Sequence, residues 1–165
     1  MLKTINPLLS PDALHALCAM GHEVAICDAH YPSEMVARHT GYGKVVRMDG
    51  ADTGEALRAI LSVLELDHQF VEFPAERMIV DGEPDAMPHV QVEAQQALDD
   101  AMGKLTPFGR IARQDFYGCS RAAFLMIQTG ETRGWGCFIL RKGLIVTPDQ
   151  PAMRGDSHIN QYGAA

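Results

Sequence analysis

The segment most informative about the architecture lies near the start of the chain and reads Gly21-His22-Glu23-Val24-Ala25-Ile26-Cys27-Asp28-Ala29-His30. Gly21 is a helix stop signal, and the apolar run Val24–Cys27 has the length of a buried strand. Asp28 follows at the carboxyl end of this strand, where open α/β sheets build their binding sites. His22 stands at the other end, and imidazole exchanges protons near neutral pH. The segment therefore indicates acid–base chemistry on a small polar molecule.

Helices and strands alternate along the chain. One helix is expected from Ser10, a capping hydroxyl followed by proline, to Gly21, and Thr53 is expected to cap a second helix. Two more are expected from Pro88 to about Met102 and over Asp115–Ala122. The expected strands are Val24–Cys27, Lys44–Met48, Phe70–Phe73, Met78–Val80, Ala123–Thr129 and Cys137–Arg141. This alternation predicts an α/β domain in which helices pack on a sheet.

Composition limits the class of protein. Of the 165 residues, 47% are apolar and 21% charged, as in a single soluble globular domain. The net charge of −7 argues against nucleic acid or an anionic membrane as a partner. No apolar run approaches the roughly 18 residues of a membrane span. The N-terminus lacks the basic and then apolar layout of a signal peptide.

The four cysteines and the C-terminus carry further expectations. Cys18, Cys27, Cys119 and Cys137 form no Cys-x-x-Cys pair, and three of them lie in apolar runs, which favours a reduced, cytoplasmic protein. Residues 148–165 hold almost no apolar side chains. We therefore expect residues 1–147 to form the domain and residues 148–165 to be a mobile tail.

Short motifs along the chain carry a resemblance to a known family. They are Met1-Leu2-Lys3-Thr4-Ile5, Pro7-Leu8-Leu9-Ser10-Pro11, Met20-Gly21-His22, Asp28-Ala29-His30-Tyr31-Pro32, Arg47-Met48-Asp49-Gly50, Leu64-Glu65-Leu66-Asp67, Arg113 with Phe116-Tyr117, Thr129-Gly130-Glu131 and Leu140-Arg141-Lys142-Gly143. In order and spacing they resemble the L-fucose mutarotases, siblings of the D-ribose pyranases, over roughly residues 1–148. The resemblance implies a three-layer α/β/α protomer with a central mixed sheet. It also implies pentameric rings, often stacked as decamers.

The resemblance further implies a cofactor-free isomerase that interconverts the α and β anomers of a free monosaccharide, L-fucose or a related sugar. An acid protonates the ring oxygen while a base removes the proton of the anomeric hydroxyl, so that the ring opens and closes on its other face. This chemistry needs no metal. His22, Asp28 and His30 also match no compact ligand spacing for a metal.

Three residues receive roles from the resemblance, and each also has a purely structural interpretation. His22 matches the family's proton donor, or else it caps the end of a helix. Asp28 matches a sugar-binding carboxylate, which accepts from two adjacent hydroxyls, or else it caps a turn. Arg113 matches a sugar-binding arginine whose donors suit polyol oxygens, or else it is a solvated charge.

Tyr117, Trp135 and Cys137 complete the expected site. Tyr117 is our candidate for the second proton transfer, although a tyrosine here is by default a core residue. Trp135-Gly136-Cys137 aligns where the family usually has Tyr-Gly-Asn, and an indole can stack on a sugar face. A thiol does not replace an amide that both donates and accepts. We therefore expect a substrate contact to be lost at Cys137.

A second departure lies beside His22. The family typically reads Gly-His-Gly-Asp-Glu, whereas here Glu23 follows His22 directly, as if two residues were deleted. The missing aspartate would orient the histidine, so Glu23 either takes that role or points into solvent. Three functions stay open: a monosaccharide mutarotase, a non-catalytic sugar-binding oligomer of the same fold, and an enzyme that acts on a related sugar or sugar acid.

Overall fold

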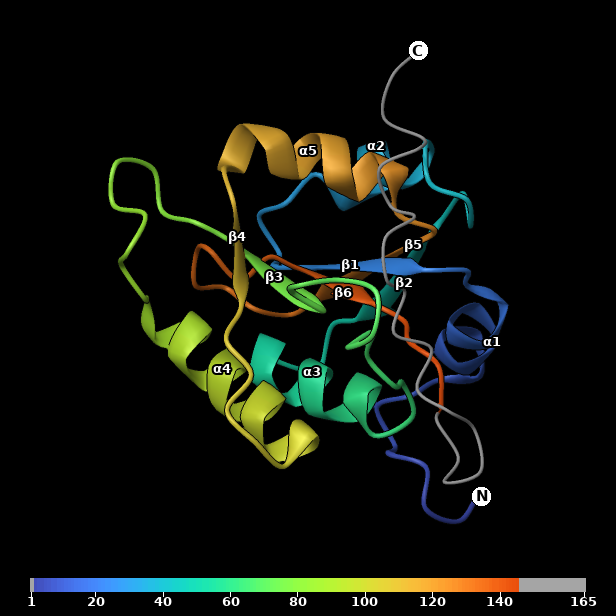
Figure 1. Ribbon diagram of the computed structural model, residues 1–165. Coiled ribbons are helices and arrows are strands. Elements are labelled where there is room, and N and C mark those ends of the chain that lie inside the picture. The colour runs from blue at the N-terminus through green and yellow to red at the C-terminus, as the bar shows by residue number, and fades with distance from the viewer. Residues whose placement is uncertain (1, 146–165) are drawn as a thin grey trace.

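The computed structural model describes residues 2–145. At its centre is one sheet of six strands in the order β2-β5-β1-β6-β3-β4 (Figure 1). The strands are β1 Glu23–Cys27, β2 Val45–Met48, β3 Ala75–Met78, β4 Gly109–Ile111, β5 Leu125–Thr129 and β6 Phe138–Arg141. The sheet is mixed, because β1 runs parallel to β5 on one side and antiparallel to β6 on the other.

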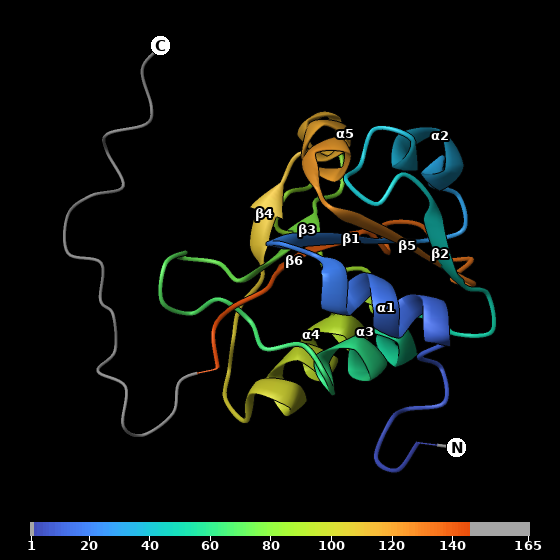
Figure 2. The same cartoon turned by 90° about the vertical axis from the view of Figure 1, so that its right-hand side faces the viewer.

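Helices cover both faces of this sheet. They are α1 Pro11–Ala19, α2 Ser33–Ala37, α3 Thr53–Leu61, α4 His89–Met102 and α5 Arg113–Ala122. Figures 1 and 2 show α2 and α5 on one face and α1, α3 and α4 on the other. The predicted α/β fold, with a mixed sheet between two helical layers, is confirmed.

Strand β1 is buried on both of its faces. Val24 and Ile26 belong to the apolar cluster on the α1, α3 and α4 side, and Ala25 and Cys27 belong to the cluster on the α2 and α5 side. None of these four residues has any exposed surface. A strand covered on both faces reads as a continuous apolar run, which is why it stood out in the sequence.

The helix caps agree with the sequence in one case and differ in the other. Ser10 caps α1 as expected, its Oγ accepting from the N–H of Ala13 at 3.1 Å. Asp52, rather than Thr53, caps α3. The Asp52 carboxylate accepts from Glu55 N at 2.8 Å, and Glu55 accepts from Asp52 N at 3.1 Å. This reciprocal pair needs acceptors three residues apart, a spacing that Asp52 and Glu55 provide.

Some of the expected strands are wrong. The segment 70–73 is not a strand, because the Asp67 carboxylate accepts from Gln69 N and Phe70 N at 3.1 and 3.0 Å and turns the backbone there. Of the segment 78–80, only Met78 lies in β3. The sequence did not predict α2 and β4, whose five and three residues are too few to show a period.

The remaining expectations concern membrane spans, the cysteines, the tail and the location of the protein. Among residues 2–145, no helix has the length and apolar character needed to cross a membrane. The four cysteines are free. The predicted tail 148–165 lies outside the described residues, so the domain boundary at residue 147 stays a prediction. The cytoplasmic location stays a prediction as well.

Candidate active site

Asp28 is fixed at the carboxyl end of β1 and is only 3% exposed. Its Oδ1 accepts from the backbone N–H groups of His30 and Tyr31, each at 3.1 Å. Its Oδ2 accepts from the N–H of Gly136 at 3.0 Å. The turn-capping interpretation is therefore correct. A carboxylate offers about four lone-pair positions, so these three bonds still leave room for a ligand hydroxyl.

Gly136 brings a second loop against Asp28. A Cβ at Gly136 would meet Thr53 Oγ1 at 2.9 Å and Asp28 Cβ at 3.3 Å, so a side chain does not fit there. The preceding residue, Trp135, has a φ of 71°, which is unusual for a residue other than glycine. Gln91 Nε2 donates to the carbonyl of Trp135 at 2.9 Å and helps to hold this conformation.

Gln91 is part of a buried polar network that includes the guanidinium of Arg77. Gln91 is fully buried and Arg77 is 3% exposed. Arg77 Nη1 donates to Gln91 Oε1 at 2.7 Å and to the carbonyl of Ala86 at 3.1 Å, while Nη2 donates to the carbonyl of Pro84 at 2.9 Å. The network thereby ties the loop after β3 and the Trp135 loop to the same buried guanidinium.

These loops surround a hollow of about 180 Å³ at the carboxyl end of β1. Five of the six predicted site residues line it, namely Asp28, Arg113, Tyr117, Trp135 and Cys137. His30, Tyr31, Met78 and Gly134 complete the lining. Pockets for drug-sized ligands span about 300–1,000 Å³, so this smaller hollow suits a single small polar molecule.

Arg113 and Tyr117 reach the pocket from α5. Arg113 Nε donates to Asp81 Oδ2 at 2.5 Å, with the two side chains 45% and 53% exposed. Such an exposed pair contributes about 1 kcal/mol or less, so a ligand can compete for the guanidinium. The Tyr117 ring stacks on Tyr31 with 5.2 Å between centroids. Burial raises the pKa of Tyr31, whose hydroxyl pairs with Ser120 at 2.6 Å, so Tyr31 is a neutral support for Tyr117.

His22, the sixth predicted residue, lies at the opposite end of β1. The five residues of the strand separate it from Asp28, which at about 3.3 Å per residue corresponds to roughly 20 Å. One chain therefore does not bring His22 into the Asp28 pocket, and His22 does not share a metal with Asp28 and His30. Within residues 2–145, no three His, Cys, Asp or Glu side chains gather into a metal-binding group.

The partner of His22 is Asp67. His22 Nε2 lies 3.2 Å from Asp67 Oδ2, and the imidazole is 52% exposed whereas the carboxylate is 5% exposed. Burial by itself raises the pKa of Asp67, but hydrogen bonds from Phe70 N–H, His22 and Gln69 N–H outweigh it and hold that pKa below its ordinary value. An ionised carboxylate on Nε2 fixes the ring and leaves Nδ1 for proton exchange.

Glu23 takes neither of the roles considered for it. Arg141 stands directly opposite Glu23 in the register of β1 and β6, and its Nε donates to Glu23 Oε1 at 2.9 Å. Glu23 therefore faces neither His22 nor open solvent. The role of orienting His22, which the sequence comparison gave to a missing aspartate, falls to Asp67.

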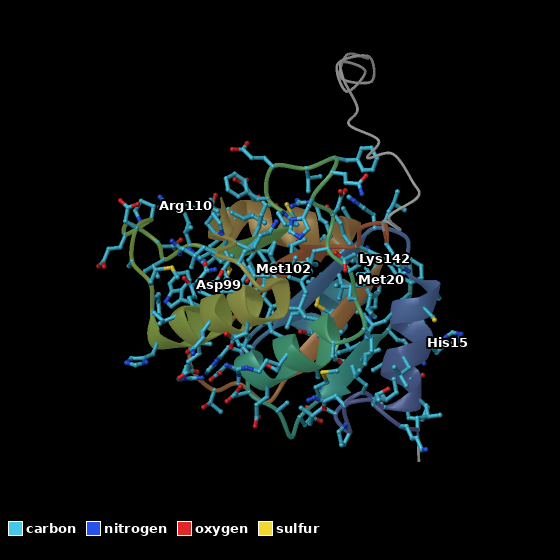
Figure 3. The ribbon with its side chains drawn as sticks, turned by 60° about the horizontal axis from the view of Figure 1, so that its bottom comes forward. His15, Met20, Asp99, Met102, Arg110 and Lys142 are labelled. Carbon is cyan, nitrogen blue, oxygen red and sulfur yellow. The ribbon has the colours of Figure 1, made fainter. Side chains whose placement is uncertain are left out.

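The helix-capping interpretation of His22 is also wrong. Lys142 Nζ occupies the C-terminus of α1 and donates to the carbonyls of Leu17 at 3.4 Å and Met20 at 3.2 Å. Figure 3 shows Lys142 beside Met20. Since a cation already complements this helix end, the imidazole is directed to Asp67 instead.

A wider hollow of about 430 Å³ opens beside His22. Its lining includes Gly21, His22, Asp67, Phe70, Val71, Lys142, Gly143 and Leu144. Two large apolar side chains of this lining are exposed, Phe70 at 41% and Leu144 at 60%. Apolar surface gathered in this way is typical of an interaction site.

Glu131 is a buried carboxylate that supports the loops around the Asp28 pocket. It is 3% exposed and accepts from the N–H of Thr53 at 3.4 Å and from Arg133 Nη2 at 2.7 Å. Its own carbonyl accepts from Ala29 N at 2.8 Å, in the turn that carries the pocket. Hydrogen bonding from Arg133 outweighs burial and lowers the pKa of Glu131 from 4.5 to about 2. The pocket floor is therefore held by an ionised carboxylate.

Comparison with known proteins identifies the family of the chain. The chain matches the RbsD / FucU transport protein family over residues 3–145. It belongs to this family. The L-fucose mutarotase of Histophilus somni strain 2336 is 36% identical over 151 residues, which cover 90% of this chain and 99% of that protein. The family predicted from the motifs is confirmed.

Solved RbsD/FucU structures share the fold. The protein Atu2016, to which sugar binding has been ascribed, is 48% identical with a TM-score of 0.85 and covers 88% of this chain and 97% of its own. The fucose mutarotase of Streptococcus pneumoniae in complex with L-fucose is 34% identical with a TM-score of 0.75, covering 88% and 100%. RbsD of Bacillus subtilis complexed with D-ribose, at 14% identity and a TM-score of 0.61, shows the fold alone.

Several residues of this RbsD/FucU protein were missed as site residues. Asp67 stands in a motif that carried the family resemblance, so a signal for it was present. Gln91 lies beside Val90 on the buried side of α4, and a polar residue on an apolar face is itself a signal. Nothing in the sequence around Asp81 indicates that it pairs with Arg113.

Proposed function

We propose that this protein is a monosaccharide mutarotase, an isomerase that interconverts the anomers of a free sugar, L-fucose or a related aldose. Its family membership and its 36% identity to an L-fucose mutarotase support the reaction. The observation that carries the proposal is the pocket lining, where Asp28, Arg113, Tyr117 and Trp135 meet. A carboxylate, a guanidinium, a phenol and an indole match the hydroxyls and apolar face of one sugar ring.

The binding roles follow from these groups. The remaining lone pair of Asp28 accepts from one sugar hydroxyl, and Arg113 donates to ring substituents once its exposed pair with Asp81 opens. Trp135, held by Gln91, covers the apolar face of the sugar. Cys137 offers only a weak donor where the family usually has an amide, so the contact there is weaker.

The proton transfers fall to His22 and Tyr117. His22 protonates the ring oxygen through Nδ1, while Asp67 holds Nε2. Tyr117 exchanges the proton of the anomeric hydroxyl, the ring opens, and rotation about the first carbon–carbon bond allows closure on either face. General acid–base catalysis of this kind contributes on the order of 10²–10⁴-fold.

A second copy of the chain has to supply His22, because one chain separates it from Asp28 by the length of β1. A closed ring of identical subunits, a pentamer or a stacked decamer, repeats one heterologous contact around its axis. In such a contact the apolar rim beside His22 covers the Asp28 pocket of the neighbouring subunit. Each site then holds an acid from one subunit and a sugar receptor from the next.

The reaction is tested by magnetisation-exchange NMR on a panel of free aldoses with and without the protein. We expect faster anomer exchange for L-fucose or a close relative. A rate that never exceeds the buffer rate for any sugar would overturn the catalytic proposal.

The shared site is tested by mixing two inactive variants. His22→Ala lacks the acid and Asp28→Asn lacks the receptor carboxylate, but a mixed ring contains some interfaces with both native groups. Co-expression in equal amounts should restore about one quarter of wild-type exchange, since each native group is present with a probability of one half. Separately purified variants, not allowed to exchange subunits, are the control, and no recovery in the mixed rings contradicts the shared site.

The second candidate is a non-catalytic sugar-binding oligomer. The sugar binding ascribed to Atu2016, at 48% identity, and the exchange of an amide for Cys137 favour it. Calorimetric binding of a sugar whose anomers exchange only at the buffer rate would select this candidate over the mutarotase.

A further inference from the structure

Cys27 and Cys137 face each other across two neighbouring strands. The antiparallel register of β1 and β6 pairs Ile26 with Phe138, so the next position outward pairs Cys27 with Cys137. Lys142 N donates to His22 O at 2.7 Å, which makes that pair a hydrogen-bonded one. Because pair types alternate along the ladder, the cysteines form a non-hydrogen-bonded pair.

This type of pair has the spacing that a disulfide needs. In a non-hydrogen-bonded pair the Cα atoms are about 4.5 Å apart and the side chains lie close together. Disulfides span Cα separations of about 4.4–6.8 Å. Cys27 and Cys137 also belong to the same apolar cluster, so both sulfurs are on the α2 and α5 face of the sheet.

The two thiols are packed in a dry, sulfur-rich environment. Both cysteines have no exposed surface, and Cys27 Sγ donates to Met126 Sδ at 3.6 Å. Burial, together with Cys137 and then the charge of Asp28, raises the pKa of Cys27. Cys27 is therefore a neutral thiol at neutral pH, and its partner is the one that meets the pocket.

Cys137 connects this pair to the sugar pocket. It is part of the lining of the 180 Å³ hollow, but its own surface is closed to solvent, so a reagent smaller than a sugar reaches the sulfur when the lining opens. Along the chain, Cys27 precedes Asp28 and Cys137 follows Gly136, the two residues that are joined by the 3.0 Å hydrogen bond. A covalent link between the cysteines would thus act directly on the receptor carboxylate.

We propose that Cys27 and Cys137 are an oxidisable dithiol in the floor of the pocket, closed to a disulfide by hydrogen peroxide. The Cys137 thiolate attacks a peroxide oxygen, the O–O bond breaks, and the leaving hydroxide takes up a proton as water. Cys27 sulfur then attacks the resulting sulfenic acid, the S–O bond breaks, and a second water leaves. In total the thiols lose two electrons and two protons, and one peroxide is reduced to two waters.

The form with the Cys27–Cys137 disulfide should bind the sugar more weakly. The disulfide draws the Cys137 sulfur out of the lining and fixes the spacing of Asp28 and Gly136. We expect the dissociation constant for the sugar to rise at least threefold and dithiothreitol to restore it. We also expect saturating sugar to slow closure, because the ring covers Cys137, and this second expectation rests on the proposed function.

The test uses the full chain treated with peroxide, then denatured and alkylated with N-ethylmaleimide. Intact mass should be lower by two hydrogen atoms before alkylation, only Cys18 and Cys119 should be alkylated, and peptide mapping should recover a Cys27–Cys137 linked pair. Cys27→Ala and Cys137→Ala should each abolish closure. Cys18→Ala and Cys119→Ala are the matched controls and should close as wild type does.

The outcomes separate the inference from the proposed function. Four alkylated cysteines after treatment, or a link that involves Cys18 or Cys119, would overturn the dithiol whatever the enzyme does. Closure without protection by a sugar shown to bind would overturn the placement of the pair in the sugar pocket. Absence of anomer exchange leaves the mass measurement intact, since closure requires no turnover.

Discussion

The two ends of β1 are built in opposite ways. At the carboxyl end, Asp28 is 3% exposed and three backbone N–H groups hold its oxygens in a hollow of about 180 Å³. At the amino end, the imidazole of His22 is 52% exposed beside a hollow of about 430 Å³ with an apolar rim. In the proposed function, the carboxyl end is a receptor that is already shaped, and the amino end presents the proton donor outward.

This difference is consistent with the division of chemistry in the proposed mechanism. A receptor for a neutral sugar gains from fixed acceptors, because their ordering is completed during folding rather than during binding. A proton donor that projects from the surface works only when something covers it. The apolar rim with Phe70 and Leu144 therefore makes assembly part of the proposed mechanism rather than an addition to it.

The largest effect is expected from His22→Ala, which tests the role of the amino end of β1. We expect anomer exchange to fall by about 10²-fold or more, because the general acid is lost. Sugar affinity should change little, because Asp28 and Arg113 remain. Exchange NMR gives the rate and calorimetry the affinity. His39→Ala, at another exposed histidine, should keep the wild-type rate, and an equal rate in both variants would remove His22 from the mechanism.

Glu131→Gln tests how rigidly the receptor end is held. Because the pKa of Glu131 is lowered from 4.5 to about 2 in the folded protein, its contribution is fully present above pH 4.5 and is lost as pH falls toward 2. The shift corresponds to about 3 kcal/mol at neutral pH. Urea unfolding at fixed protein concentration should show that loss at pH 7 and almost none near pH 2.

The control for Glu131 is an exposed carboxylate. Glu34 lies 3.7 Å from Arg47 and is 69% exposed, so Glu34→Gln should cost less than about 1 kcal/mol at any pH. A Glu131→Gln penalty that does not depend on pH would mean that packing, rather than ionisation, supports the pocket.

Much of the receptor end was predictable, and the donor end was not. Asp28 was expected at the carboxyl end of a strand, and Arg113, Tyr117 and Trp135 were expected in the same site because the motifs match a family. For the group that orients His22, the sequence offers only Glu23, which either takes that role or points into solvent, because adjacency along the chain is the only guide. The register of β1 on β6 sends Glu23 to Arg141, and a loop 45 residues away supplies Asp67. Such long-range choices depend on packing that local patterns do not encode.

Asp67→Asn tests whether Asp67, rather than Glu23, orients His22. The amide keeps the shape of the carboxylate but loses the charge that holds Nε2 of His22, so we expect exchange to fall about tenfold, the lower range for loss of an orienting partner. Glu23→Gln is the matched control and should leave exchange unchanged. The reverse pattern, a loss with Glu23→Gln alone, would restore the interpretation that the structure overturned.

The smallest expected effect comes from Gln91→Glu, which separates the shape of the receptor from its chemistry. The new carboxylate still accepts from Arg77 but no longer donates to the carbonyls of Met78 and Trp135. Loss of these two hydrogen bonds, together about 1 kcal/mol at the lower end of their usual range, should raise KM about fivefold and leave kcat nearly unchanged. Trp135 is the chain's only tryptophan, so its emission should shift to the red as the loop loosens. Gln114→Glu, at an exposed position on α5, adds the same charge away from the network and should change neither quantity. If Gln91→Glu also leaves both unchanged, the bond between Gly136 and Asp28 is sufficient to hold the loop.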